Sequence, residues 1–284
     1  MAFLARMLAR RLAGQERGCP FCRSADTVLE GRRRLVLELR RCRACGILFR
    51  WPKEDAATAH RFYQRAYREG MTTEMPDAAA LARLLAAGFA GSNRDLSVNV
   101  ACVKAAGGAG RLLDFGCSWG YGVHQFRRAG FDAVGYEISA PRAAYARERL
   151  GLAVIDSPAA LDGEPPGSFD VIHTAHVLEH LTDPAAALTA IARLLRPGGL
   201  LAIFVPNAGG DEARAEGAAW GPMINTKHLL AFDAAFFARN LPPFGFTGLR
   251  YSSLPHDRPP VADAAAPLPG PELLVLARRT DERP

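Results

Sequence analysis

The stretch LLDFGCSWGYG, residues 112–122, decides the fold of this chain. Two leucines lead into Asp114, a glycine-rich turn follows at 116–120, and an amphipathic run continues to Gly130. This order predicts a buried strand, a tight turn and a helix. Glycines let the turn backbone approach a ligand closely, and the following helix N-terminus presents free N–H groups. We therefore expect the turn to hold a nucleotide-like cofactor.

Downstream of residue 111, strand-like and helix-like segments alternate. This alternation implies a mainly parallel, doubly wound α/β sheet that binds ligands at the C-terminal edges of its strands. A polar insertion follows the fifth predicted strand. The expected strands are 112–114, 133–136, 153–155, 169–174, 200–205, 246–252 and 272–278, and the expected helices are 122–129, 141–150, 184–195 and 232–241.

Two acidic residues narrow the choice of cofactor. Glu137 lies 23 residues after Asp114, at the end of the second predicted strand, where a carboxylate can accept hydrogen bonds from both ribose hydroxyls. This suits NAD and S-adenosylmethionine alike. A dinucleotide loop usually has the pattern G-x-G-x-x-G and faces a pyrophosphate. Here Asp114 precedes the glycines, and an acid suits the ammonium of S-adenosylmethionine while repelling a pyrophosphate.

Four motifs in order resemble those of class I S-adenosylmethionine-dependent methyltransferases. They are DFGCSWG (114–120), GYEIS around Glu137, FDVIHTAHVLEHLTDP (169–184) and LLRPGGLLAIFVPN (194–207), and the resemblance covers roughly residues 90–280. It implies a Rossmann-like, seven-stranded sheet whose last strand is antiparallel. Ser118 stands where this family more often has glycine. The family's N-P-P-Y tetrad is absent after 169–174, which argues against methylation of adenine N6 or of a glutamine amide.

The resemblance also implies which residues bind the cofactor. The turn would cradle the methionine part, Glu137 the ribose, two residues after the third strand would lie near the adenine, and two residues after the fourth would flank the methionine and the transferred methyl. In that order the residues are Asp114, Gly116, Cys117 and Gly120; Glu137; Asp156 and Ser157; Ala175 and His176.

Two CxxC pairs precede this region, Cys19 with Cys22 and Cys42 with Cys45, separated by 19 residues. This spacing matches a structural zinc site of four cysteines. The segment between the pairs predicts strand, turn, strand, hence a zinc ribbon. Four thiolates leave no open coordination position, so the Zn²⁺ is expected to be structural. The ribbon also resembles the metal-binding front domain of some bacterial methyltransferases, several of which act on sugars or other small metabolites.

Between ribbon and sheet we expect a helical connector. A helix at 54–69 carries Phe62, Tyr63 and Tyr67 at helical spacing, which indicates core packing or a lid over the cofactor. Asp77 is expected to cap a helix running to about Phe89, and another helix is expected at 96–106. The predicted domains are a zinc ribbon with a basic N-terminal helix (1–52), a helical connector or lid (53–106) and a methyltransferase domain (107–284).

Histidines are the candidate catalytic residues, because neutral imidazole is the natural base near pH 7. His180 lies in the LEHL turn, where Glu179 can orient it, and His228 lies in the polar insertion. Each is a candidate base or substrate contact, against structural or packing alternatives. We expect His173 to pack within its strand and His60, His124 and His256 to be surface or helix residues. Trp220 and Met223 are expected to form an apolar substrate wall or to pack.

Charge is distributed unevenly along the chain. The net charge is +6, but residues 1–70 carry 16 Lys and Arg against 7 Asp and Glu, whereas the remainder is net negative. A basic first quarter indicates an anionic partner or a solvated arginine-rich surface. The expected acceptor is a small molecule: a sugar, a saccharide precursor or a phenolic metabolite. The alternatives are an RNA methyltransferase whose ribbon binds RNA, and a non-catalytic binding protein.

Composition bounds the setting of the protein. No apolar run approaches the roughly 20 residues that span a bilayer, and the basic N-terminus lacks the apolar core and cleavage site of a secretory signal. We therefore expect a cytoplasmic protein with reduced cysteines, and a homodimer as one oligomeric state. An amphipathic helix at the membrane surface is the alternative to a packed helix for the N-terminus.

Overall fold

The computed structural model describes residues 2–61, 64, 74–222 and 227–280. The chain divides into two compact units, each discontinuous in sequence. The domain boundaries expected near residues 52 and 106 stay predictions. The first unit comprises Met1–Ala56, Ala175–Ala192 and Ile203–Pro284, and the second comprises Ala57–Thr174 and Arg193–Ala202.

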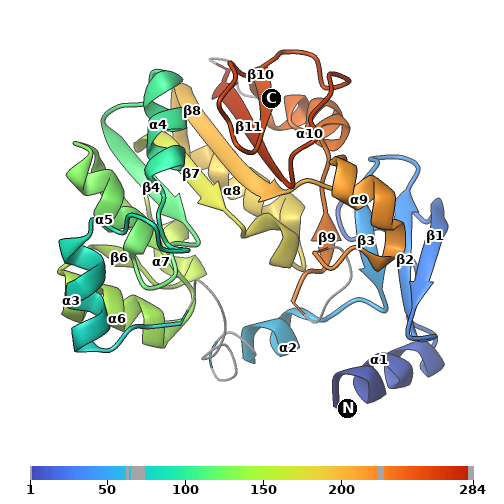
Figure 1. Ribbon diagram of the computed structural model, residues 1–284. Coiled ribbons are helices and arrows are strands. Elements are labelled where there is room, and N and C mark those ends of the chain that lie inside the picture. Colours follow the sequence, from blue (N-terminus) through green and yellow to red (C-terminus); the bar gives the residue numbers. More distant parts are fainter. Residues whose placement is uncertain (1, 62–63, 65–73, 223–226, 281–284) are drawn as a thin grey trace. The chain divides into compact units, whose positions relative to one another are not determined.

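The predicted seven-stranded sheet is present, in the order β10-β11-β8-β7-β4-β5-β6 (Figure 1). β4 pairs in parallel with β5 and β7, and β5 pairs in parallel with β6. β10 and β11 pair antiparallel, as expected for the end of this Rossmann-like sheet. The strands are β4 (Arg111–Phe115), β5 (Asp132–Tyr136), β6 (Val154–Ile155), β7 (Phe169–Ala175), β8 (Leu195–Pro206), β10 (Phe246–Ser253) and β11 (Glu272–Arg279).

The connecting helices lie close to their predicted positions: α5 (Tyr121–Arg128), α6 (Ala140–Leu150), α8 (Pro184–Leu194) and α10 (Ala234–Asn240). Helix α7 (Pro158–Asp162) was not predicted. Ser157 begins it by accepting a hydrogen bond from the N–H of Ala160 at 3.2 Å. Strand β8 starts earlier than expected, because the chain passes from α8 directly into the strand. The Arg-Pro-Gly-Gly segment that was expected to close α8 therefore belongs to β8.

A second sheet has the order β1-β2-β3-β9. β1 (Thr27–Arg33) and β2 (Leu37–Cys42) form the predicted antiparallel hairpin, and β3 (Leu48–Trp51) pairs with β2. The fourth strand, β9 (Leu230–Ala231), comes from the insertion after β8 and pairs with β3. A strand of two residues has no alternation pattern to detect, so the sequence did not predict this pairing.

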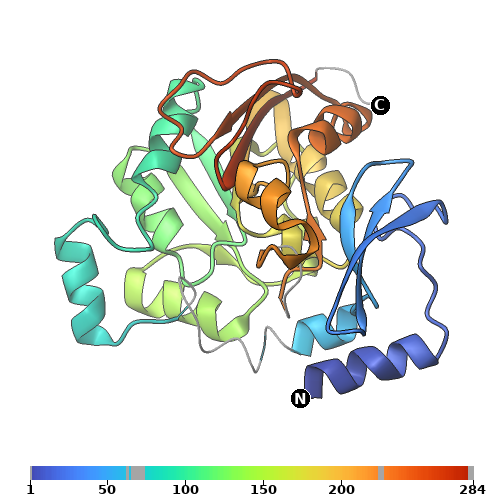
Figure 2. The same cartoon turned by 45° about the vertical axis from the view of Figure 1, so that its right-hand side comes forward.

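Helix α1 (Ala2–Leu12) packs on this second sheet (Figure 2). Met7 is fully buried in a cluster that also contains Leu37, Leu39 and Leu48. Trp220 is buried in the same cluster. Of the two roles expected for Trp220, packing is the one that the structure has, and Met223 lies outside the described residues.

The connector is helical where it is described. α2 (Ala56–Arg61) is shorter than the predicted helix, and the aromatic residues Phe62, Tyr63 and Tyr67 lie outside the described residues. Asp77 caps α3 (Ala78–Ala86), its Oδ1 accepting from Ala80 N at 2.7 Å. The remaining helices are α4 (Ser97–Ala105), α9 (Asp211–Glu216) and three single 3₁₀ turns at Leu178–His180, Gly217–Ala219 and Pro242–Phe244.

None of the helices within the described ranges is long and apolar enough to cross a bilayer.

Candidate functional site

The turn after β4 folds back onto the end of β5. The N–H groups of Gly116 and Cys117 both donate to the carbonyl oxygen of Tyr136, at 2.8 and 3.0 Å. Gly116 and Gly120 have φ of 86° and 90°, which a side chain disfavours. Ser118 holds the same left-handed region at φ 52°. Cys117 is buried, which raises the pKa of its thiol, so only its backbone serves the turn.

Glu137, at the end of β5, closes this turn from the other side. Its Oε2 accepts from the N–H of Ser118 at 3.0 Å, and its Oε1 accepts from the N–H of Ser139 at 2.7 Å. The residue is buried, and burial raises the pKa of its carboxyl despite these two donors. Each carboxylate oxygen keeps a second lone pair that can accept from a ribose hydroxyl. The donor set therefore fits the predicted cofactor.

Asp114 is held by a buried histidine. Its Oδ1 lies 2.8 Å from Nδ1 of His173, and Nε2 of the same ring lies 3.1 Å from Nδ2 of Asn99. The amide of Asn99 donates to Nε2, so Nδ1 carries the hydrogen that Asp114 accepts. His173 was expected to pack, and it is fully buried, but it also positions the first acid of the turn.

The strand register contained the signal for this pair. Asp114 on β4 and His173 on β7 are register partners in the parallel sheet. Adjacent strands place such residues side by side on the same face. Once the strand order is known, the contact follows.

The two residues expected near the adenine follow β6. Oδ2 of Asp156 lies 2.9 Å from Nη2 of Arg147, and both side chains are exposed. The hydroxyl of Ser157 caps α7, as described above. Their proximity to the cofactor stays a prediction.

Ala175 and His176 belong to the other compact unit. His176 has a left-handed φ of 53°, and its Nε2 lies 2.7 Å from Oε2 of Glu272. His256 was expected on a helix or the surface, which is wrong: its side chain is buried and its Nε2 lies 3.2 Å from Oε1 of Glu272. Glu272, on the last strand, therefore joins two histidines that are far apart in sequence.

The same unit brings Glu179, His180 and His228 together. The two imidazole rings meet edge to face, with centroids 4.6 Å apart. Both carboxylate oxygens of Glu179 are buried and accept no hydrogen bond within the described part of the chain, although Oε1 lies 3.4 Å from Nδ1 of His176. One ligand atom of each of Glu179, His180 and His228 lies within 4.8 Å of the others, so the cluster could also hold a metal ion.

Backbone carbonyls fix the tautomers of the two rings. Nδ1 of His180 lies 3.2 Å from the carbonyl oxygen of Lys227, and Nδ1 of His228 lies 2.6 Å from that of Pro222. A carbonyl can only accept, so Nδ1 carries the hydrogen and Nε2 is the basic nitrogen of each ring. Burial, followed by the neighbouring His180, lowers the pKa of His228 to about 4. Burial also lowers the pKa of His180.

These positions differ from one sequence expectation. His228 does not begin a helix; it precedes β9, and the next helix starts at Ala234 after its cap, Asp233. Asn225 and Thr226, expected beside His228, lie outside the described residues.

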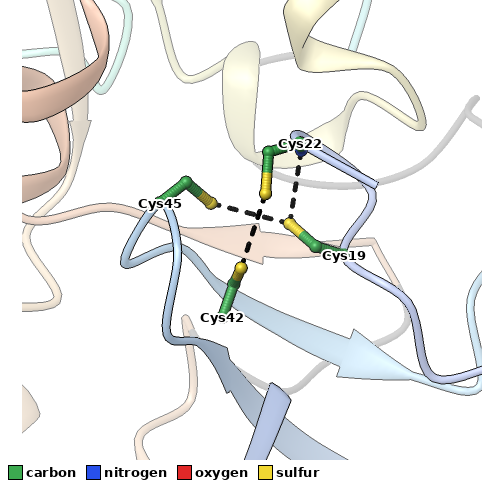
Figure 3. Close-up of side chains that lie close together, drawn as sticks. All are labelled: Cys19, Cys22, Cys42 and Cys45. Carbon is green, nitrogen blue, oxygen red and sulfur yellow. Dashed lines mark hydrogen bonds between the residues drawn. The ribbon is translucent and has the colours of Figure 1, made fainter. Parts of the chain in front are cut away.

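The four cysteines of the CxxC pairs converge in the second sheet (Figure 3). Sγ of Cys19 lies 3.6 Å from Sγ of Cys45, and Sγ of Cys22 lies 3.5 Å from Sγ of Cys42. Thiolates about 2.3 Å from a tetrahedral Zn²⁺ would lie about 3.8 Å apart, close to both distances. Contact with Cys45 and the N–H groups of Cys22 and Phe21 lower the pKa of Cys19 to about 5. The cluster therefore fits the expected ion.

Comparison with known proteins agrees with this fold and turn. The family model described as a methyltransferase domain matches residues 63–251. The chain belongs to this methyltransferase family. Together with the strand order, the match makes it a class I, S-adenosylmethionine-dependent methyltransferase by family.

Curated relatives match a shorter segment of the methyltransferase. It is 39% identical over 99 residues to the ubiquinone biosynthesis O-methyltransferase of Methylococcus capsulatus, covering 32% of this chain and 41% of that one. The corresponding protein of Cereibacter sphaeroides is 40% identical over 96 residues, covering 32% and 39%. The chain thus spans about two fifths of the length of these relatives.

Among solved structures, a Thermotoga maritima protein described as a SAM-dependent methyltransferase and possible histamine N-methyltransferase superposes with a TM-score of 0.50. It is 19% identical in sequence, and the match covers 64% of this chain and 87% of that one. At this identity the likeness concerns the fold alone.

Proposed function

We propose that the protein transfers a methyl group from S-adenosylmethionine to a hydroxyl of a small-molecule acceptor. The observation that carries this proposal is the Glu137 carboxylate, held by the N–H groups of Ser118 and Ser139 at the end of β5. It forms a ready acceptor for the ribose beside the glycine turn. The curated relatives named as ubiquinone biosynthesis O-methyltransferases support an oxygen acceptor. A sugar, a saccharide precursor or a phenol would supply that hydroxyl.

The bound cofactor would supply an activated methyl group on a sulfonium, so the protein's part is alignment and proton removal. Nε2 of His228 is the basic nitrogen of a buried ring that stays neutral near pH 7. We assign it the acceptor's proton. His180 packs edge to face against His228 and is the second candidate base. Glu179, buried beside them, would stabilise the imidazolium that forms.

We also propose that Cys19, Cys22, Cys42 and Cys45 hold a structural Zn²⁺. The support is their convergence at thiolate spacing and their CxxC pattern. All four positions of a tetrahedral ion would be filled, so the metal would stabilise the second sheet and take no part in the transfer.

The test is a transfer assay with radiolabelled S-adenosylmethionine against metabolite and RNA fractions, run with two variants. His228→Ala should lower the rate about 100-fold or more, since a general base contributes that much, while cofactor affinity measured by calorimetry stays within about twofold. Glu137→Gln should instead weaken cofactor binding about tenfold, because it replaces a charged acceptor. His124→Gln, on α5 and packed on Phe89, is the control and should leave both quantities unchanged.

Each outcome decides something. Full activity in His228→Ala removes that residue from catalysis. Label in the RNA fraction, with a steep salt dependence, would replace the small-molecule acceptor by RNA. Failure of the wild-type protein to bind S-adenosylmethionine would overturn the enzymatic proposal. Loss of activity on chelation, restored by a divalent cation, would assign the Glu179 cluster to a metal ion in place of a histidine base.

A further inference from the structure

Arg50, on β3, is a buried cation whose charge is poorly compensated. Its side chain is fully buried, and none of its three guanidinium nitrogens has a hydrogen-bond partner within the described residues. The nearest carboxylate is that of Glu54, with Oε2 3.9 Å from Nη2. The face of the Phe3 ring lies 4.8 Å from the guanidinium carbon. A buried guanidinium without hydrogen bonds is costly unless something else supplies acceptors.

Glu54 cannot neutralise Arg50 by itself, because it is shared. Arg6 contacts its Oε2 at 3.1 Å and Arg10 contacts its Oε1 at 3.4 Å, both closer than Arg50. One carboxylate therefore serves three guanidinium groups. Burial, in spite of Glu54, lowers the pKa of Arg50 to about 10, so the group is still charged near pH 7.

A cavity of about 310 Å³ adjoins this arginine. Its charged lining residues are Arg23, Arg50, Lys53, Glu54 and Asp183, so cations outnumber carboxylates. Burial, together with the nearby Arg23, lowers the pKa of Lys53, as expected in a positive field. Arg23 pairs with Asp183 at 2.7 Å, but both of these side chains are exposed, and exposed pairs are weak.

The chain continues from the candidate catalytic histidines into this cavity. Leu181, Thr182 and Asp183 follow His180 directly and line it, and Leu229 follows His228 and does the same. The N–H of Leu229 donates to the carbonyl oxygen of Glu179 at 2.8 Å, which ties the two segments together. A ligand in the cavity would therefore lie beside the segments that hold the candidate base.

We propose that this cavity binds a phosphate or diphosphate group of the methyl acceptor, with Arg50 as its buried anchor. A guanidinium presents parallel N–H donors that match two oxygens of a phosphate, and Lys53 adds a second donor. The acceptor is then a phosphorylated small molecule, such as a sugar phosphate or diphosphate ester. The inference rests on the proposed function for the transfer itself, but the anion site stands on its own geometry.

The site is tested first with inorganic pyrophosphate on the full-length protein, by calorimetry in phosphate-free buffer. We expect salt-sensitive binding that Arg50→Met weakens about tenfold or more, because a charged hydrogen-bond donor is lost. Arg128→Met, an exposed arginine at the end of α5, is the matched control and should bind as the wild type does. Absence of pyrophosphate binding by the wild type, or unchanged binding by Arg50→Met, overturns the proposal.

Folding is checked in the same samples by S-adenosylmethionine affinity and thermal unfolding. If Arg50→Met fails these checks, Lys53→Met replaces it and should weaken pyrophosphate binding by a smaller factor. Unchanged binding in that variant would also contradict the site.

The acceptor class is tested with the labelled transfer assay on metabolite extract, with and without prior treatment by a phosphodiesterase and a phosphatase. We expect the treatment to abolish most of the labelled product. Label that is equally strong after treatment contradicts a phosphorylated acceptor but leaves the transferase proposal intact. No label in either extract contradicts the proposed function, whereas the pyrophosphate experiment still decides the anion site.

Discussion

At the scale of single residues, the two candidate bases have their protonation set by the backbone. His180 and His228 each turn Nδ1 toward a carbonyl oxygen, so each has Nε2 as its basic nitrogen. Burial then keeps both rings neutral, and for His228 the neighbouring His180 adds to the effect. Because a base must be unprotonated to act, a lowered pKa widens the pH range in which His228 can work.

The pH profile of transfer follows from this shift. His228 is neutral well above its pKa of about 4, so kcat should be level between roughly pH 6 and 8 and fall only as pH drops below about 5. An ordinary histidine would begin to lose activity near pH 6.5. The measurement is kcat against pH with saturating acceptor, and an inflection at or above pH 6.5 would contradict a base with the environment of His228.

Sequence reasoning at this scale worked where the backbone dictates the residue. Glu137 was predicted from its distance to Asp114, because a strand, a helix and a second strand fix that spacing. The partnership of Asp114 with His173 was missed, since it depends on which strands are neighbours. Arg50 was missed for another reason: nothing in the local sequence shows that an arginine in a basic segment will be buried.

At the scale of elements, two tight backbone devices hold the site: the glycine turn between β4 and α5, and the cysteine knuckles of the second sheet. Both were predictable because each has a short local signature with a physical cause. Helix α7 and strand β9 were not, since five and two residues are too short to show a periodicity.

The glycine turn gives a paired prediction. Gly120 has φ 90°, and a Cβ there would lie 2.7 Å from Cδ1 of Leu152, whereas Gly130 has φ 97° and no atom within 4 Å. Gly130→Ala should cost about 1–2 kcal/mol in the free energy of unfolding, for its conformation alone. Gly120→Ala should cost measurably more and also weaken S-adenosylmethionine binding. Denaturant unfolding compares them, and equal losses would contradict the packing argument.

The cysteine cluster gives a second. Cys42→Ser should release bound zinc and lower the midpoint of thermal unfolding, because three remaining thiolates no longer close the site. Cys102→Ser, on α4 and outside the cluster, should retain the metal. Metal content by elemental analysis decides, and equal zinc in the two variants would contradict the four-cysteine assignment.

At the scale of the whole molecule, the first 52 residues are less separate than their sequence suggests. Within one compact unit, Phe21 packs on Phe236 with ring centroids 5.1 Å apart, and Nδ2 of Asn240 donates to the carbonyl oxygen of Cys45 at 2.8 Å. Strand β9 completes their sheet. The sequence could not show this, because the contacts join residues nearly 200 positions apart.

A fragment of residues 1–56 tests this dependence. Expressed alone with zinc, it should bind the metal but unfold without a cooperative thermal transition, because it lacks β9 and the cover of α10. The full chain under the same conditions is the reference. A sharp transition by circular dichroism in the fragment would show an independently folded ribbon.

The pairing of β3 with β9 also has a consequence for how the chain is made. At roughly 5–20 residues per second, the roughly 180 residues between β3 and β9 take on the order of 10–40 seconds to synthesise. During that interval β3 is an edge strand without its final neighbour, and such edges invite association between nascent chains. Early capture of zinc by Cys19, Cys22, Cys42 and Cys45 would hold the hairpin together until Leu230 and Ala231 leave the ribosome. Zinc-starved cells should therefore accumulate this protein as aggregate during translation, whereas zinc removed after folding would do less harm.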